Sequence, residues 1–227
     1  MLRLLIVLLL GSGLAAIHAP AQAAKANENA RIQRSVEVLD EIMRMPERSI
    51  PRKLLNDAYA IAVIPDVVKA SLMLGGRHGR GVISIRLPDG TWSTPSFISL
   101  TGGSLGFQAG VQATDVVLVF RSERGVDSIV NGKFTLGADA GVAAGPVGRT
   151  AQASTDGHLR AEIYSYSRSR GLFAGVALDG AVLAIDHRAN ARAYGNNTTP
   201  RAAFEGRVRK SPPAVPDFRD RLEEFGT

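Results

Sequence analysis

The spacing of hydrophobic residues changes from a helical to a strand-like period near residue 60. From Asn27 to Met45 apolar side chains recur at the spacing of one helix face, and charged residues occupy the other face. Pro46 ends this predicted helix, and a second short helix is expected to start at Pro51, because proline suits the first turn of a helix. The apolar positions of the first helix are Ile32, Val36, Leu39, Ile42 and Met43.

Apolar and polar residues then alternate, which is typical of β-strands. Val82–Arg86 is predicted to be a strand that turns at Pro88-Asp89-Gly90 and pairs with Thr91–Leu100. A helix is predicted at Ser122–Val130, with Ser122 as its cap. Four further strands are predicted, at Leu105–Gln112, Val116–Arg121, Phe134–Gly141 and Ala161–Ser167.

The last strand pair and the C-terminal segment have different signals. Asp179-Gly180 is a strong hairpin signal, so Leu172–Leu178 and Ala181–Ile185 are predicted to pair with each other. Asn196–Pro216 is polar and contains several prolines, which predicts a flexible or extended linker. A short amphipathic helix is expected after it, at Asp217–Phe225.

These elements predict one α+β domain over residues 24–195, followed by a linker and short tail over residues 196–227. The N-terminal helices should pack on a largely antiparallel, strongly curved or barrel-like sheet. Glycines inside the predicted strands favour this curvature, because glycine in a strand marks bulges and bends.

Residues 1–23 have the pattern of a secretory signal peptide. Arg3 precedes the apolar run Leu4–Leu10, and the small residues Ala21-Gln22-Ala23 suit cleavage after Ala23. A retained anchor helix is the alternative, but the run is shorter than the roughly 20 apolar residues that span a bilayer. The chain has no cysteine, which excludes a lipidated cysteine and disulfides. We therefore expect an exported bacterial protein, periplasmic or secreted and able to associate peripherally with a membrane.

The charge balance is a mild bias toward anionic partners. Removal of residues 1–23 takes away one basic residue, Arg3, so the formal net charge falls from +6 to about +5. Aromatic residues are scarce and do not alternate with basic ones, so nucleic acid is not an expected partner. The first helix carries Arg31, Arg34 and Arg44 near its polar side and could lie on a membrane. Acidic residues on that side favour packing on the sheet instead.

A basic glycine-rich segment, Gly75–Gly81, is the main candidate for binding an anion. Glycines expose backbone N–H groups, and the planar arginine fork can hold a phosphate through two hydrogen bonds. The segment lacks the Gly-Lys-Ser/Thr of a phosphate-binding nucleotide loop, and solvated arginines in a plain turn are the alternative. The residues expected at an anionic lipid or phosphate surface are Arg48, Arg52, Lys53, Lys69, Arg77, His78, Arg80 and Arg86.

Enzymatic and metal chemistry have weaker support. Gly102-Gly103-Ser104-Leu105-Gly106 has the letters of a serine-hydrolase elbow, but a strand rather than the required helix is predicted after Ser104. His158 or His187 would have to complete the triad. The histidines have no metal-ligand spacing, and Asp186 before His187 is better explained as a helix cap with Asn190 in the next turn. We predict no catalytic residue, no metal and no cofactor.

Several motifs in order along the chain resemble the SYLF family, a lipid-binding domain family whose fungal members also bind actin. They are the segments Tyr59–Phe120, Lys133–Gly141, Ile163-Tyr164-Ser165-Tyr166-Ser167, Gly171–Gly175 and Asp186-His187-Arg188-Ala189-Asn190. The resemblance covers about 160 residues, and no reaction is associated with the family. Ala193 stands before Tyr194 where many relatives have a second aromatic residue.

The resemblance implies non-enzymatic, peripheral binding of anionic phospholipid headgroups, here at a bacterial envelope. An exported protein does not meet actin, so actin is not an expected partner. Three alternatives stay open. One is an envelope protein-interaction module that uses the glycine-rich sheet edge, another is a closed sheet that carries a lipid inside, and the third is a hydrolase.

Overall fold

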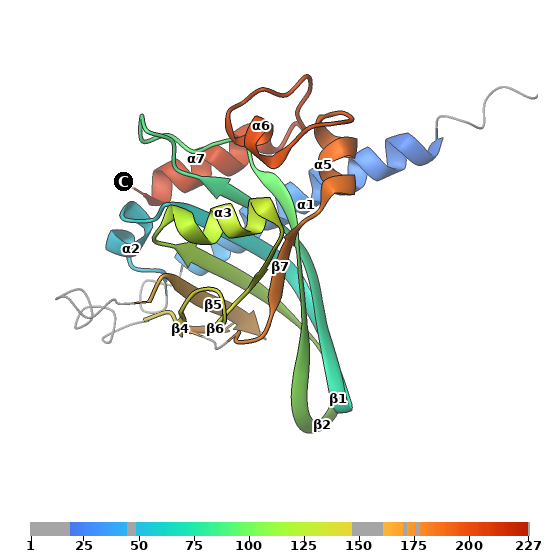
Figure 1. The fold of residues 1–227 in the computed structure, drawn as a ribbon, viewed down its shortest axis with the longest axis vertical. Coiled ribbons are helices and arrows are strands. Elements are labelled where there is room, and N and C mark those ends of the chain that lie inside the picture. The colour runs from blue at the N-terminus through green and yellow to red at the C-terminus, as the bar shows by residue number, and fades with distance from the viewer. Residues whose placement is uncertain (1–18, 45–48, 147–160, 170–171, 176–177, 227) are drawn as a thin grey trace, which may run out of the picture.

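The computed structural model describes residues 19–44, 49–146, 161–169, 172–175 and 178–226. A strongly curved sheet lies at its centre, and helices cover both of its faces (Figure 1). The predicted α+β class, with helices first and a curved, mostly antiparallel sheet after them, is confirmed.

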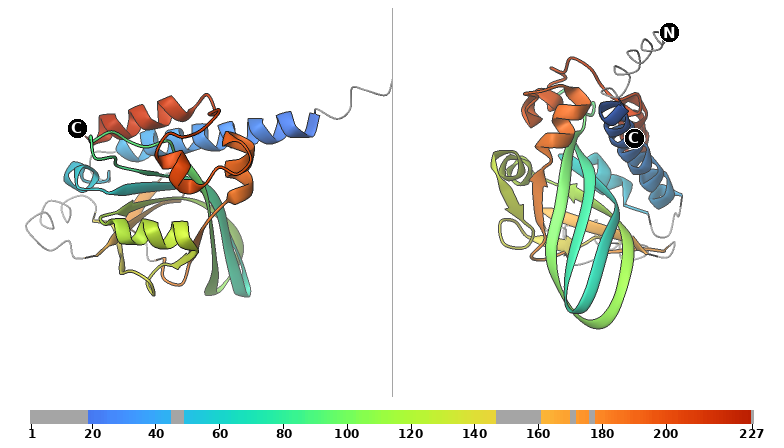
Figure 2. Two further views of the ribbon diagram at one scale, coloured as in Figure 1. Left: turned by 45° about the horizontal axis from the view of Figure 1, so that its top comes forward. Right: turned by 90° about the vertical axis from the view of Figure 1, so that its right-hand side faces the viewer.

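Two unusually long strands dominate the sheet. β1 (Ala60–Ile85) and β2 (Ser96–Phe120) pair antiparallel along their whole length, with register shifts at Ile64/Val67 and Ser71/Met73. Midway, both strands bend back, so that the two-stranded ribbon is doubled and its bend projects from the body (Figures 1 and 2). At the base the two halves of β1 meet, where the Arg86 N–H donates to the Tyr59 carbonyl at 2.7 Å.

Glycine makes the close approach of the two halves of β1 possible. A Cβ atom on Gly81 would overlap the carbonyl oxygen of Val63, and one on Gly79 would collide with the side chains of Val67 and Ile64. Any larger residue would therefore push the two halves apart. The segment predicted as a glycine loop is in fact the returning half of a strand.

Short strands extend the ribbon on each half of β2. β7 (Val182–Ile185) pairs with residues 98–101 of β2, and β3 (Lys133–Thr135) pairs with β7. β5 (Ile163–Ser169) pairs with residues 115–120 of β2. β4 (Val142–Ala144) is parallel to β5, and β6 (Leu172–Gly175) is antiparallel to it.

Several predicted strand boundaries are wrong. The turn at Pro88–Gly90 is present, but the partner strand begins at Ser96 rather than at Thr91. The strands predicted at Leu105–Gln112 and Val116–Arg121 belong to the single strand β2, which ends at Phe120 and also contains residues 101–104. Of the strand predicted at Phe134–Gly141, only the start is β3, since the chain turns at Gly137, where φ is +86°.

The predicted hairpin across Asp179-Gly180 is also wrong. The chain does turn there, with φ of +75° at Gly180. Among the described residues, however, β6 pairs with β5, whereas β7 pairs with β2 and β3. The local turn signal was correct, but the sheet separates the two strands that it connects.

Alternation along the strands divides the core between the two faces of the sheet. Ile61 and Val63 face α1 (Ala19–Met43), α5 (His187–Tyr194) and α7 (Val215–Phe225). Ala60 and Ala62 face the concave side with α3 (Glu123–Asn131). Because both faces are covered, residues 60–64 are buried continuously although their side chains alternate between the two faces.

The predicted helices are present with shifted ends. The first runs from Ala19 and packs Ile32, Leu39 and Ile42 into the core, as the packing interpretation expected. α2 (Arg52–Asn56) follows Pro51. None of the helices in the described ranges is long and apolar enough to span a bilayer. The proposed cleavage site lies inside the segment that α1 covers, and residues 1–18 lie outside the described residues.

The segment predicted as a flexible linker is largely folded. α6 (Pro200–Phe204) buries Pro200 and Phe204, and the Ala214 N–H donates to Asn29 Oδ1 of α1 at 2.9 Å. α7, predicted as a short amphipathic helix, buries Phe218 and Leu222 beside α1. Small apolar residues between the prolines made burial possible where composition alone favoured a linker.

Candidate functional site

A basic groove lies between α1 and the outer face of β1. It has a volume of about 510 Å³, and the residues of β1 that line it come from both halves of the strand. Its charged and titratable lining consists of Arg31 and Arg34 from α1 and Asp66, His78 and Arg80 from β1, so cationic groups predominate. Ala30, Pro65 and Val68 add apolar surface.

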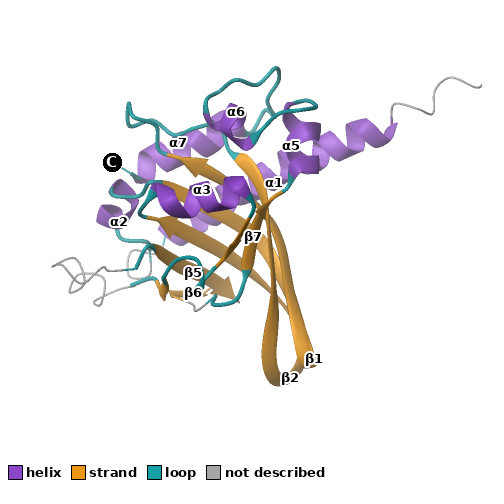
Figure 3. Cartoon of the chain, viewed as in Figure 1, coloured by secondary structure: helices purple, strands orange, loops and turns teal. Residues whose placement is uncertain are grey.

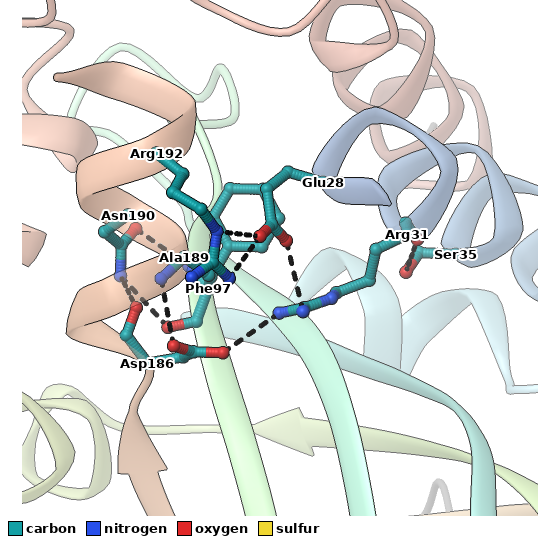
Figure 4. Close-up of polar contacts among 8 residues, drawn as sticks. All are labelled: Glu28, Arg31, Ser35, Phe97, Asp186, Ala189, Asn190 and Arg192. Atoms are coloured by element: carbon teal, nitrogen blue, oxygen red, sulfur yellow. Dashed lines mark hydrogen bonds and ion pairs between the residues drawn. The ribbon is translucent and has the colours of Figure 1, made fainter. Parts of the chain in front are cut away.

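Arg31 belongs to a buried charge network that joins α1 to α5 (Figure 4). Its guanidinium lies 3.1 Å from Glu28 Oε2 and 3.3 Å from Asp186 Oδ2. Glu28 is fully buried and also accepts from Arg192 Nε at 2.8 Å. Each buried charge here has an opposite charge beside it, as burial requires. Arg31 is therefore a structural residue, although part of its side chain lines the groove.

The motif at residues 186–190 stabilises the same region, where α5 packs beside α1 and β2. Asp186 caps α5, as predicted, by accepting from the Ala189 N–H at 3.0 Å. The buried Asn190 amide accepts from the Phe97 N–H at 3.0 Å and donates to the Phe97 carbonyl at 3.1 Å. These bonds attach α5 to β2 (Figure 4). The family motif thus has a structural role in this chain.

Arg34, one turn farther along α1 on the same wall of the groove, is also compensated. It lies 3.0 Å from Glu37, 3.5 Å from Asp66 and 3.6 Å from Asp115. Burial opposes its charge, but the hydrogen bond to Glu37 and the nearby carboxylates together raise the pKa of Arg34. Asp66 has φ of +49°, and its N–H donates to Asp115 Oδ1 at 3.0 Å, which holds the irregular turn of β1 after Pro65.

The remaining groove cations differ from these arginines. Arg80 and His78 are exposed, and within the described ranges neither has an ion-pair partner. Lys69 and Arg77 lie farther along the ribbon and likewise have no carboxylate partner among the described side chains. The Nε of Arg77 is buried without a hydrogen-bond acceptor. Four predicted basic site residues are thus brought onto one part of β1 without carboxylate partners among the described residues.

The other predicted residues lie elsewhere. Arg86 stacks on Trp92 at 4.5 Å, and its guanidinium donates to the carbonyls of Ala58, Leu55 and Gly90. Burial lowers the pKa of Arg86, and these bonds make it a structural residue. Arg52 and Lys53 are exposed on α2, away from the groove lining, and Arg48 lies outside the described residues.

The alternative chemistries gain no support from the fold. β2 continues as a strand through residues 102–106 and beyond, so the helix that a nucleophile elbow needs is absent from this part of the described chain. His187 is exposed on α5, and His158 lies outside the described residues. Among the described side chains no group of three His, Cys, Asp or Glu residues could hold a metal ion.

Sequence reasoning missed the wall that α1 contributes to the groove. Arg31 and Arg34 were placed near the polar side of the helix, but nothing in the sequence aligned them with residues 78–80 of β1. One signal was available. Glu28 and Arg31 are one helical turn apart beside the apolar positions, which is typical of a charge pair at the edge of a buried face.

Comparison with known proteins assigns the family. The model of the Ysc84 family, described as "Las17-binding protein actin regulator", matches residues 101–225, from β2 through α7. The chain belongs to this family. It is the SYLF family that the motifs indicated, and the matched region includes α6 and α7.

The Ysc84 relatives are eukaryotic and longer. "LAS seventeen-binding protein 3" of Saccharomyces cerevisiae is 39% identical over 176 residues, which is 76% of this chain and 38% of the relative. "Protein YSC84" of the same yeast is 40% identical over 176 residues, 76% of this chain and 37% of the relative. Human "SH3 domain-containing YSC84-like protein 1" is 36% identical over 150 residues, 66% and 44% of the two chains. The chain spans about two-fifths of the length of these relatives.

Proposed function

We propose that this protein binds anionic phospholipid headgroups peripherally and catalyses no reaction. The observation that supports this most directly is the set of basic residues on β1 without carboxylate partners among the described residues: Lys69, Arg77, His78 and Arg80. In the same region Arg31 and Arg34 are paired with acidic groups. A structural role explains the paired arginines, and an external anion would explain the unpaired ones.

The expected binding is weak and sensitive to salt. Each basic group near an anionic bilayer contributes on the order of 1 kcal/mol, and this attraction falls off within a Debye length. Arg77 and Arg80 can each hold a phosphate through two hydrogen bonds. The groove beside His78 and Arg80 gives one headgroup room to enter between α1 and β1.

The membrane that we propose is that of a bacterial envelope. The signal-peptide pattern of residues 1–23 supports export, and an envelope offers phosphatidylglycerol, cardiolipin and lipopolysaccharide phosphates. The protein would then act from the periplasm or outside the cell.

Vesicle co-sedimentation of the protein lacking residues 1–23 tests the proposal. We expect pelleting with phosphatidylglycerol-containing vesicles, release by salt, and no pelleting with phosphatidylcholine alone. Arg80→Ala should weaken binding about five-fold, since one charge contributes about 1 kcal/mol. Arg124→Ala, on α3 across the sheet, is the matched control and should leave binding unchanged. Absence of binding at low salt would overturn the proposal.

A second candidate function is protein binding, because the family description names Las17 binding and actin regulation. Co-sedimentation with actin filaments distinguishes it. Pelleting with filaments in the absence of lipid would support this second function, whereas the export signal predicts none.

A further inference from the structure

The bend of the β1–β2 ribbon has an unusual composition. Residues 70–76 of β1 and 102–111 of β2 contain no Asp, Glu, Lys, Arg or His. Their sequences are ASLMLGG and GGSLGFQAGV. This part of the ribbon projects from the helices and from the rest of the sheet (Figures 1 and 3). Val68, just before it, is 43% exposed, which is unusual for a large apolar side chain.

The bend also lacks further strand partners. β2 pairs with β7 only up to Thr101 and with β5 only from Asp115, so among the described residues the bend is a two-stranded ribbon. An isolated ribbon is marginal in water, and an uncharged, apolar strand edge invites association with another surface. Something other than this chain's described elements is therefore expected to cover it.

The charges beside the bend indicate what covers it. Lys69 and Arg77 flank the uncharged residues on β1, and His78 and Arg80 follow. The acidic residues nearest to the bend on each strand, Asp66 and Asp115, are both engaged by Arg34. An uncharged bend flanked by basic residues matches the order of hydrocarbon and phosphate at an anionic membrane surface. Two copies meeting through their bends would instead bring like charges together.

We propose that the ribbon bend, residues 70–76 and 102–111, inserts into the acyl boundary of an anionic membrane. The proposal rests on the proposed function and identifies the inserting element. Leu72 in the bend lies three residues from Lys69 and five from Arg77, about 10 and 17 Å of strand at ~3.3 Å per residue. The shorter of these lengths suits an interfacial depth of about 5–10 Å. Deeper insertion is excluded, because unpaired backbone groups at a ribbon edge need water or headgroups.

The absence of cysteine makes a clean depth measurement possible. A Phe107→Cys variant, labelled with an environment-sensitive fluorophore, places one probe in the bend opposite the register shift. Asn196→Cys places the control probe at an exposed position after α5. With vesicles of phosphatidylglycerol and phosphatidylcholine, the bend probe should shift to the blue and brighten at least two-fold. Acyl-brominated lipids should quench it, and the control probe should change in neither experiment.

Three other outcomes would overturn the insertion proposal, and they show whether headgroup binding fails with it. Pelleting with vesicles but no spectral change at the bend would leave headgroup binding intact and refute insertion. If the protein neither pelleted with vesicles nor showed a spectral change at the bend, both proposals would be refuted. A blue shift without vesicles that grows with protein concentration would show that a second copy covers the bend.

A polar variant gives an independent test. Leu72→Asp should lower vesicle affinity at least ten-fold while the circular dichroism spectrum stays unchanged. Should this variant fail to fold, Phe107→Ser in the other strand replaces it. Unchanged affinity in a folded variant would refute insertion.

Discussion

The arginines in and around the groove are of two kinds, and the difference between them separates structure from function. Arg31 and Arg192 share the buried carboxylate of Glu28, and Arg31 also reaches Asp186. Arg77 and Arg80, on the neighbouring strand, have no acidic partner among the described residues. The buried Arg31 keeps its charge beside two carboxylates, whereas the exposed Arg80 has its charge where an external anion can bind. Whether an arginine has a carboxylate beside it therefore identifies a binding residue better than the residue type alone does.

Removal of the shared carboxylate should have the largest effect. Glu28→Ala leaves Arg31 and Arg192 without their common partner in a buried site, and we expect a loss of about 3–5 kcal/mol in the free energy of unfolding. Urea denaturation measures it. Glu205→Ala removes an exposed partner of Arg207 and should cost less than about 1 kcal/mol. Equal costs would show that the network has no structural role.

Loss of the Asn190 amide should have the next largest effect. Asn190→Ala leaves the buried Phe97 N–H and carbonyl without that partner, which should cost about 1–3 kcal/mol. The matched control, Asn196→Ala, changes an exposed asparagine two residues beyond the end of α5 and should be nearly neutral. Thermal unfolding of the two variants, compared at the same protein concentration, decides the matter.

The smallest change in stability, and a clear change in binding, is expected at Arg77. Arg77→Met keeps the apolar part of the side chain but removes the charged guanidinium, whose Nε has no hydrogen-bond acceptor. The free energy of unfolding should stay within about 0.5 kcal/mol of the parent, while vesicle affinity falls about five-fold. Arg31→Met should do the reverse, with a large loss of stability and little direct effect on binding. If both variants lost stability equally, the distinction between the two kinds of arginine would fail.

The sequence predicted local features well and long-range ones poorly. The first helix, the Pro88–Gly90 turn, the Asp186 cap and the C-terminal amphipathic helix all depend on neighbouring residues, and all are present. The doubling of the ribbon depends on contacts between residues far apart in the sequence, such as Gly81 and Val63, which are 18 positions apart, so the glycines were taken for loops. Sequence alone could not distinguish these two roles of glycine.

The candidate site was predicted in the same uneven way. His78 and Arg80 were found because basic residues and glycines cluster there, and they do line the groove. Arg86 was chosen for its charge alone, although three backbone carbonyls accept from it. The wall that α1 contributes forms through contact between elements more than 30 residues apart in the sequence. No local sequence pattern predicts such a contact.

The packing of α1 has a consequence for the order of folding. Its partners lie close to the far end of the chain, since Glu28 bonds to Arg192 and Asn29 bonds to Ala214. During synthesis α1 emerges first but cannot bury its charges until α5 and the start of α7 have left the ribosome. Such distant contacts slow folding, because the intervening chain must be ordered before they form. The first helix made is therefore among the last to dock, and its arginines stay exposed until then.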